Sequence, residues 1–240
     1  MTSTRRFEEL SVHDLGGRIS ESSILLLPLG AIEAHGPHLP LGTDLLIAEH
    51  AVHSLVDRFG DELDVWALPS LGYTKSNEHA WAPGTVWLSA TTMLAVLDDI
   101  GRSLATTRAR KLVFVNGHGG NHDALSAAVS RCVADGRRVL GWSPSVPAGG
   151  DLHAGRTETS VMSVIHPELV RAERVAPGAT GALDVLLASM RRGGVRSVAA
   201  SGVLGDPTGH SEQEGDRILA AWTRSLVLAF DTWCENAAQR

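Results

Sequence analysis

Short apolar runs alternate along this chain with longer stretches in which apolar residues recur every three or four positions. A short continuous run is typical of a buried strand, and the longer recurrence is typical of an amphipathic helix. The pattern predicts strands at 23–29, 63–68, 85–88, 111–116, 138–142 and, at one edge, 195–198. It predicts helices at 45–59, 90–107, 122–135, 156–165, 183–192 and 212–234. This alternation indicates an α/β fold with a mostly parallel central sheet and helices on both faces.

Some residues at the ends of these elements predict where the helices begin and end. Asp44 is well placed to cap the 45–59 helix, and Gly60 is expected to end it. Asn121 can cap the 122–135 helix in the same way. No internal repeat or second-domain boundary is apparent, so residues 1–240 are expected to form a single domain that begins with a polar lead-in at 1–22. The loop 70–84 is long for a compact domain, and its aromatic residues favour a functional role over disorder.

Composition and charge argue against several classes of protein. The 240 residues carry a net charge of −6 without an acidic or basic block, which disfavours a nucleic-acid surface and a polybasic membrane anchor. The apolar runs are too short for a transmembrane helix, and no apolar core of a signal peptide follows Arg5 and Arg6. Cys132 and Cys234 fall in helical patterns and are expected to be buried thiols, which indicates a reducing cytoplasm.

Side chains that bind divalent metals stand in the loops after two predicted strands. Glu33, His35 and Asp44 follow the first strand, and His118 lies in a glycine-rich loop after the 111–116 strand. Ligands usually bind at the carboxyl ends of strands in an open α/β sheet. The plainer interpretation is that Glu33 and His35 are solvated and that Asp44 only caps a helix. The loop around His118 is not a nucleotide fingerprint, because its glycines lack the G-x-G-x-x-G spacing.

A further pair, His153 and Glu158, stands at the start of the 156–165 helix. A carboxylate near a helix start is electrostatically favoured without a metal, so Glu158 alone is not diagnostic. The candidate ligands together are three carboxylates and two imidazoles with no thiolate, a mixture that suits zinc, manganese or iron(II). Two divalent ions on such a set leave positive charge for a bridging hydroxide, the nucleophile of two-metal hydrolases.

Three motifs in this order resemble the creatininase family of metal-dependent amidohydrolases. They are LPLGAIEAHGPHLPLGTD at 27–44, VNGHGGN at 115–121 and HAGRTETS at 153–160. The resemblance covers nearly the whole chain and implies a dinuclear site in an α/β fold. It also implies assembly as a ring-like homo-oligomer such as a hexamer, and hydrolysis of an amide C–N bond.

The resemblance gives each candidate ligand a place. Glu33 and His118 would hold one metal, and His35 and Glu158 would hold the other. Asp44 would bridge the two ions.

The same resemblance assigns His153 a part in the chemistry, as a group that stabilises the oxyanion or protonates the leaving nitrogen. One position departs from creatininase itself, which has a glutamate two residues after the histidine of the second motif. Here that residue is Gly120. The missing carboxylate must then come from Glu158, and creatinine becomes a doubtful substrate.

Within the family, the second half of the chain looks most like members of the mycofactocin system, through HAGRTETSV, RRGGV at 191–195 and GVLGDPTG at 202–209. Those proteins are peptidases that trim the C-terminal Val-Tyr-derived end of a ribosomally made precursor. The alternative is a hydrolase of a small amide, such as a creatinine-like cyclic amide or a formamide.

Four further residues are candidates for binding the substrate. Trp81 and Trp142 could form walls of a pocket, although a place in the core is as plausible for each. Lys75 or Arg156 could recognise a substrate carboxylate. Two non-hydrolytic interpretations, a nucleotide-binding protein and a scaffold, are disfavoured by the absent nucleotide fingerprint and by the presence of all the candidate ligands.

Overall fold

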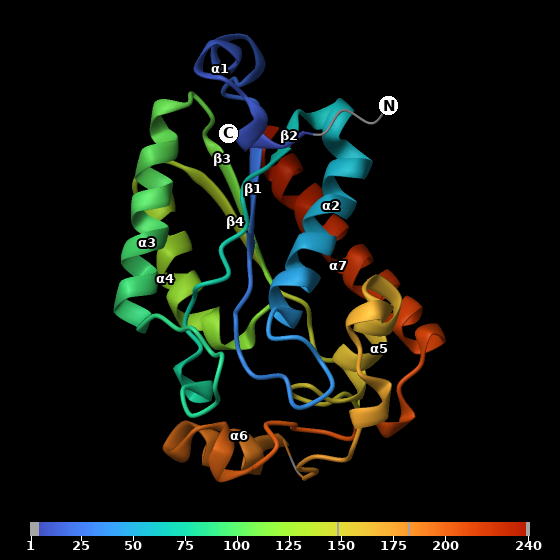
Figure 1. Cartoon of the computed structure of the whole chain (residues 1–240). Helices are drawn as coiled ribbons and strands as arrows, with labels where there is room; N and C mark the ends of the chain where they lie inside the picture. Colours follow the sequence, from blue (N-terminus) through green and yellow to red (C-terminus); the bar gives the residue numbers. More distant parts are fainter. Residues whose placement is uncertain (1–4, 148, 182, 239–240) are drawn as a thin grey trace.

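The computed structural model describes residues 5–147, 149–181 and 183–238. Within these ranges the strands form a parallel sheet with the order β2-β1-β3-β4 (Figure 1). The strands are β1 (Ile24–Leu29), β2 (Val65–Ala67), β3 (Lys111–Asn116) and β4 (Arg138–Trp142). Ile24 stands opposite Val65 on one side and Lys111 on the other. The expected parallel sheet is therefore confirmed.

Helices cover both faces of this sheet. The α-helices of the described ranges are α1 (Val12–Arg18), α2 (Thr43–Leu63), α3 (Ala90–Ser103), α4 (His122–Ala134), α5 (Arg156–Ile165), α6 (Leu183–Gly193) and α7 (Glu212–Ala238). Figure 1 shows α3 and α4 on one side, and α2, α5 and α7 on the other. Helix α6 lies beyond the carboxyl ends of the strands instead of on a face. The α/β fold with two helical layers is thus as predicted.

Strand β1 is buried along its whole length and divides the core in two. Leu25, Leu27 and Leu29 join the apolar cluster formed with α3 and α4, whereas Ile24 and Leu26 join the one formed with α2 and α7. Successive side chains of a strand point to opposite faces, so a strand covered on both faces is apolar at every position. This explains why the sequence shows an unbroken apolar run here.

Two glycines let the start of α2 cross the carboxyl ends of β1 and β3. A Cβ at Gly30 would lie 2.3 Å from the Leu45 Cα, and a Cβ at Gly117 would lie 2.1 Å from the Asp44 carbonyl oxygen. No side chain fits at such distances, so both positions require glycine. The close approach brings the first turn of α2 to the edge of the sheet where ligands are expected.

Three helix signals differ from their predictions. Asp44 lies inside the first turn of α2, whose N-cap is Gly42, and Asn121 makes no capping hydrogen bond to α4. Both side chains instead bind other polar groups at the strand ends, as described below. Gly60 does not end α2, which continues to Leu63 because tertiary packing outweighs the low helix propensity of one glycine.

Two predicted strands are also wrong. Residues 195–198 form a 3-10 helix, η7 (Val195–Ser197), after Gly194 at φ 69°, and Val195 is buried as its anchor. Residues 85–88 form only an isolated bridge from Val86 to Ile32, because Ile32 lies in the irregular loop after β1 and offers no strand to pair with. A single bridge is too short to count as a strand.

The lead-in at 1–22 holds more structure than its polar composition indicated. Within it, α1 begins with a capping box in which Ser11 and Asp14 bind each other's backbone amides. Phe7, Leu10 and Leu15 pack against the α3–α4 side of the core. Across the described residues, none of the helices combines the length and the apolar character needed to cross a bilayer.

Candidate metal centre

The loop after β1 carries the first members of a buried polar cluster. Glu33 and His35 are fully buried, and the Glu33 amide is held by a 2.9 Å hydrogen bond to the Leu41 carbonyl. Asp44 faces the same space from the first turn of α2 and is 2% exposed. Its Oδ1 lies 3.0 Å from the His35 Nε2. The loop and the helix that follows it thus bring all three side chains together.

His118 reaches Asp44 from the opposite side. Asn116 Nδ2 donates to the His118 carbonyl (2.7 Å), and Asn121 Nδ2 donates to Asn116 Oδ1 (2.9 Å), which shapes the glycine-rich loop. The His118 Nε2 lies 3.0 Å from the Lys75 carbonyl, which can only accept a hydrogen bond. The Nδ1 then faces the Asp44 Oδ2 at 2.9 Å. Asn121 therefore fixes this loop instead of capping α4.

Glu158 enters the cluster from the first turn of α5. The Asp151 carboxylate accepts hydrogen bonds from the amides of Arg156 and Thr157 (3.1 Å for Thr157), so it caps this helix. Glu158 Oε2 accepts a 2.6 Å hydrogen bond from the Ala154 amide. The same oxygen lies 3.8 Å from the His35 Nε2.

His153 lies against the imidazole of His35, with ring centroids 4.3 Å apart. Its Nε2 donates to the Ala34 carbonyl at 2.8 Å, and its Nδ1 faces the Glu33 Oε1 at 3.6 Å. The residue after it, Ala154, has φ 50°, an unfavourable conformation for a residue with a side chain. This turn aims His153 and Glu158 into one cluster.

The described residues contain three groups whose potential ligand atoms lie within 4.8 Å of one another. Two of the groups share Asp44, and the third joins Glu33 and His35 to His153, which precedes α5. They are Glu33–Asp44–His118, His35–Asp44–Glu158 and Glu33–His35–His153. The structure thus brings all five candidate ligands and His153 together, whereas their role as ligands stays a prediction.

Charges within the cluster oppose the effect of burial on Asp44 and its neighbours. Burial would raise the pKa of Asp44, but His35 and His118 hold it well below its usual range. Burial likewise disfavours a charged imidazole, yet the adjacent Asp44 carboxylate raises the pKa of His35 to about 10. The pKa of His118 also lies well above its usual value, because the charges of Glu33 and Asp44 outweigh burial. In the absence of a metal, this part of the site holds protons.

The pKa values of Glu33 and Glu158 are shifted in the opposite direction from that of Asp44. Burial raises the pKa of Glu33 to about 8 and that of Glu158 to about 7. Both Glu33 carboxylate oxygens are buried and accept no hydrogen bond from the described residues. A buried carboxylate without a donor is costly unless a cation compensates it, so the cluster suits divalent metal ions.

Glu78 and His79, in the long loop 70–84, also reach the cluster, although the sequence analysis did not assign them to it. His79 Nε2 lies 3.5 Å from Glu33 Oε1, and Glu78 Oε1 lies 3.4 Å from His118 Nε2. Burial and the nearby imidazoles lower the pKa of His79 to about 4. Lys75 Nζ donates to Glu78 Oε2 at 2.9 Å. The glutamate–histidine pair in a loop rich in aromatic residues was the signal that could have found them.

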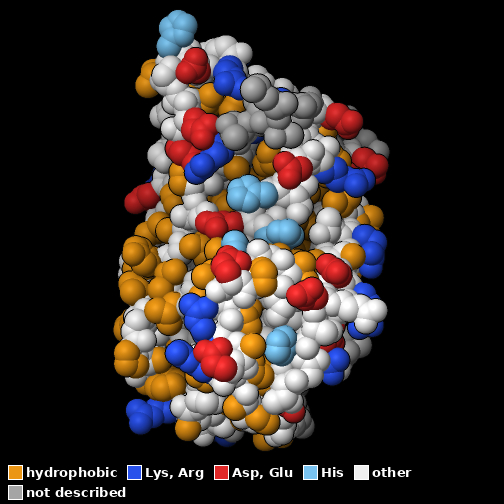
Figure 2. Space-filling view, turned by 45° about the vertical axis from the view of Figure 1, so that its right-hand side comes forward, with side chains coloured by type: hydrophobic (Ala, Val, Ile, Leu, Met, Phe, Trp, Pro, Cys, Tyr) orange, Lys and Arg blue, Asp and Glu red, His pale blue; other side chains and the backbone are white. Residues whose placement is uncertain are grey.

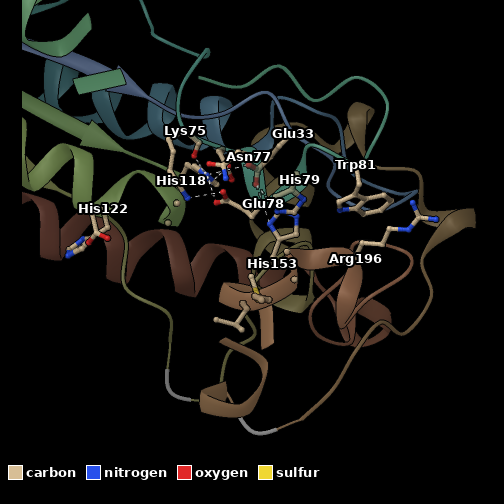
Figure 3. Close-up of a pocket in the computed structure, with 18 of the residues that line it drawn as sticks. Glu33, Lys75, Asn77, Glu78, His79, Trp81, His118, His122, His153 and Arg196 are labelled. Atoms are coloured by element: carbon tan, nitrogen blue, oxygen red, sulfur yellow. Dashed lines mark hydrogen bonds and ion pairs between the residues drawn. The ribbon is translucent and has the colours of Figure 1, made fainter. Parts of the chain in front are cut away.

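The cluster forms the floor of a cavity of about 900 Å³. Trp81 and Lys75, two of the predicted substrate-binding residues, line this cavity. Figure 3 shows Trp81 beside Arg196 on one side of the cluster and His122 on the other.

The other two predicted substrate-binding residues lie elsewhere. Trp142 is 8% exposed in the core, and its indole N–H donates to Ser225 at 3.4 Å. Arg156 faces a different cavity and pairs with Glu214 at the start of α7. Neither residue lines the cavity above the cluster, so the structure gives no support to a substrate contact for them there. The apolar face of Trp142 is used in packing β4 against α7, and the charge of Arg156 is already paired.

Comparisons of the chain with known proteins all indicate the same family. The family model described as creatinine amidohydrolase matches residues 8–230. A mycofactocin precursor peptide peptidase of Mycobacterium tuberculosis is 44% identical over 220 residues, which cover 89% of this chain and 87% of the relative. A creatinine amidohydrolase of Pseudomonas putida is 28% identical and covers 92% of this chain and 94% of its own.

Solved structures agree with this match. The crystal structure of a creatinine amidohydrolase (creatininase) has a TM-score of 0.77 at 25% identity, and the match covers 97% of this chain and 98% of that chain. A structure titled creatininase Mn has a TM-score of 0.78 at 26% identity, covering 97% of this chain and 99% of that chain. The chain belongs to the creatininase family of metal-dependent hydrolases that act on C–N bonds.

Proposed function

We propose that this protein is a dinuclear-metal-dependent peptidase that trims the C-terminal Val-Tyr-derived end of the mycofactocin precursor peptide. The observation that carries the proposal is the buried cluster of carboxylates and imidazoles at the floor of a large cavity. The relatives named mycofactocin precursor peptide peptidase, at 44% identity over most of both chains, support the choice of substrate.

The proposed metal ligands fall into two sets that share Asp44. Glu33 and His118 would hold one ion, and His35 and Glu158 would hold the other. The partnerless oxygens of Glu33 fit a cation at this place. Zinc, manganese and iron(II) all suit such a donor set. When bound, two divalent ions would polarise the scissile carbonyl and supply an activated water.

His153 is proposed to handle a proton during cleavage. Burial and the neighbouring His35 and His79 lower its pKa well below the usual value, so the imidazole is neutral near pH 7. The hydrogen bond to the Ala34 carbonyl keeps the proton on Nε2 and leaves Nδ1 as an acceptor. A neutral imidazole in this position can accept a proton and pass it to the leaving nitrogen. The oxyanion role considered from the sequence would need His153 to be protonated first.

The size of the cavity favours a peptide over the alternative small amide. A volume of about 900 Å³ lies at the upper end of the range typical of sites for drug-sized ligands. A ring as small as creatinine would leave most of that space to water. The long loop 70–84 contributes Lys75, Glu78 and Trp81 to the lining, so the wall of the cavity extends beyond the cluster's own ligands.

We further propose that the protein acts in the cytoplasm as a homo-oligomer, for which a hexamer remains the expectation. Both cysteines are free thiols, consistent with a reducing compartment. Exposed apolar side chains in the loops after β1 and β2 support self-association, because apolar surface often marks protein interfaces. They are Leu41, Tyr73, Val86 and Trp87, which are 40 to 57% exposed. On the face shown in Figure 2, acidic and basic side chains are interspersed, which does not favour a nucleic-acid partner.

Cleavage of a synthetic peptide tests the function. Protein loaded with manganese, zinc or iron(II) is incubated with the C-terminal segment of the precursor ending in Val-Tyr, and the products are identified by mass spectrometry. We expect release of the terminal dipeptide, and loss of that release in the Asp44→Asn variant. Hydrolysis of creatinine or a formamide by the same preparation, with the peptide intact, would favour the alternative.

A further inference from the structure

Two arginines at the edge of the cavity take no part in the functional site described above. Arg192, in the last turn of α6, and Arg196, in η7, both line the cavity and are exposed, so they lie where it opens to solvent. The Arg192 guanidinium donates one hydrogen bond, to the Ser189 hydroxyl at 3.2 Å. Neither guanidinium forms an ion pair with any residue of the described ranges, so the mouth of the cavity holds two cations that these residues leave uncompensated.

The turn between α6 and η7 presents these two side chains. Gly194 adopts φ 69°, and its amide donates to the Met190 carbonyl at 2.8 Å, which closes the end of α6. Val195 is fully buried and packs in a small apolar cluster with Ala199 and Leu204. Because Val195 is anchored in this way, the backbone of the neighbouring Arg196 is held at the cavity.

An aromatic ring orients the second arginine. The Arg196 guanidinium carbon lies 5.6 Å from the centre of the Trp81 ring, within the range of a cation–π contact. Figure 3 shows the two side chains next to each other at one side of the cavity. A guanidinium stacked on an aromatic face keeps its N–H groups free to bind a carboxylate in a bidentate manner. The ring therefore prepares this arginine for an anionic ligand.

The other charges of the cavity make its two ends different. Lys75 pairs with Glu78, which in turn contacts His118, so the charge of this lysine serves the interior of the site. The opposite wall is lined by His122 and by the exposed Asp123, which adds a negative charge. The cavity is thus cationic at the α6–η7 end and acidic at the α4 end. An anionic part of a ligand is attracted to the first end and repelled from the second.

The two parts of the proposed substrate would occupy different places in the cavity. The scissile bond has to lie over the cluster, and only an end derived from two residues is removed. The remainder of the precursor is a chain that has to leave the cavity through its mouth. The exposed arginines at the mouth therefore face the residues that precede the scissile bond, and the anionic groups of that segment are aspartate and glutamate side chains.

We propose that Arg192 and Arg196, the second of them stacked on Trp81, form a subsite for acidic side chains in the segment that precedes the scissile bond. The preferred ligand class is a peptide with aspartate or glutamate upstream of that bond, whatever group ends the chain. The net charge of −6 would not attract such a peptide, so its selection depends on these local cations. This inference rests on the proposed peptidase function and adds the chemistry that the protein recognises on one side of the bond.

Two synthetic peptides with the same C-terminal end and the same scissile bond test this subsite. In one, the segment that precedes the bond carries glutamates, and in the other it carries glutamines at the same positions. Exposed ion pairs change affinity by about two- to fivefold each, so the metal-loaded wild type should show a KM about 5- to 20-fold lower for the acidic peptide. The two kcat values should be similar, because the subsite acts on residues away from the scissile bond.

Charge removal and charge reversal separate recognition from a structural effect. In Arg192→Gln or Arg196→Gln the preference should fall about two- to fivefold, and in the double variant it should approach one. Arg192→Glu combined with Arg196→Glu should invert it, so that a peptide with lysines at the same positions has the lower KM. Arg224→Gln changes an exposed arginine of α7 outside the cavity lining, and this matched control should keep the wild-type preference.

Binding to the metal-free protein gives a readout that does not depend on cleavage. Fluorescence anisotropy of the labelled peptides should show the same preference for the acidic form, and salt at about 0.5 M should reduce it. Equal KM values in the wild type, or a preference that survives in the double glutamine variant, would overturn the subsite and leave the peptidase function intact. A binding preference that the double variant loses, without cleavage of either peptide, would support the subsite and reject the peptidase function.

Discussion

Gly120 provides a sharp test of how the His118 side of the site is built. A Cβ at this position would lie 2.1 Å from the Glu78 Oε1 and 2.3 Å from the His118 Nε2. Real Cβ atoms do not approach heavy atoms so closely, so Gly120→Ala must move the Glu78 carboxylate, the His118 ring or the loop itself. The neighbouring Gly119 has open space around its Cβ position and supplies a matched control, Gly119→Ala.

The size of the effect follows from what must move. Displacing a group that orients a ligating histidine typically costs about 10- to 100-fold in metal affinity. Forcing a methyl group into a packed site costs about 1–3 kcal/mol of folding stability, and the lower backbone entropy of alanine returns about 0.4–1 kcal/mol. We therefore expect Gly120→Ala to weaken metal binding at least tenfold and to lower the free energy of unfolding by about 1–2 kcal/mol.

The assay is a competition titration of zinc against a chromogenic chelator, with denaturant unfolding of the EDTA-treated protein measured in parallel. Gly119→Ala should bind zinc within about twofold of the wild type, since a change without a new contact has no reason to move a ligand. If Gly120→Ala binds zinc as tightly as Gly119→Ala, then Glu78 and His118 do not form the rigid pair that the structure shows, and the reasoning fails.

Four further predictions concern the charges around the site. Asp44→Asn should lose bound metal and should lower the free energy of unfolding of the EDTA-treated protein by about 3–5 kcal/mol at pH 7, because the carboxylate pairs with two buried imidazoles. The control Asp123→Asn, on the cavity wall, should change neither the metal content nor the free energy of unfolding. Metal affinity, measured by chelator competition, should rise with pH up to about 10, because Glu33 and Glu158, with pKa values of about 8 and 7, and His35, with a pKa of about 10, must lose their protons to bind. For the metal-free protein the sign is opposite: a carboxyl whose folded pKa lies above its ordinary value of 4.5 makes unfolding easier as pH rises toward that pKa. The lowered pKa values of His79 and His153 act the other way below about pH 6.5, so denaturation midpoints should fall between about pH 7 and 8, and unchanged midpoints there would contradict the shift. Asp151→Ala should lower the free energy of unfolding by about 1–2 kcal/mol through loss of the α5 cap, and thermal unfolding with no loss would show that the cap is dispensable.

The arrangement of the cluster could largely be predicted from the sequence, for a physical reason. Glu33 and His118 each follow a strand whose apolar run is unmistakable, and parallel strands end at the same edge of the sheet. Asp44 was placed correctly beside them as a candidate ligand, but an acidic residue near a helix start also fits the pattern of a cap, and the sequence could not decide between the two. Only the three-dimensional approach allowed by Gly30 and Gly117 shows that it faces the imidazoles instead.

The walls of the cavity were much harder to predict. Trp142 and Arg156 were chosen for their chemistry, yet one is used in the core and the other is paired with Glu214. Arg192 ends a predicted helix, and Arg196 lies in a segment whose pattern favoured an edge strand, so nothing in the sequence placed either residue at the cavity. Loop conformation depends on single anchors such as Val195, and periodicity carries no information about them.

The most direct test of the central claim is the number of divalent ions held by each chain. Purified wild-type protein, reconstituted with zinc, manganese or iron(II) and freed of excess metal, is measured by elemental analysis beside Glu158→Ala. The account predicts about two ions per wild-type chain and about one in the variant, because Glu158 belongs to only one of the two groups that share Asp44. A wild-type chain that holds one ion or none with each metal would contradict the dinuclear site on which the proposed peptidase rests.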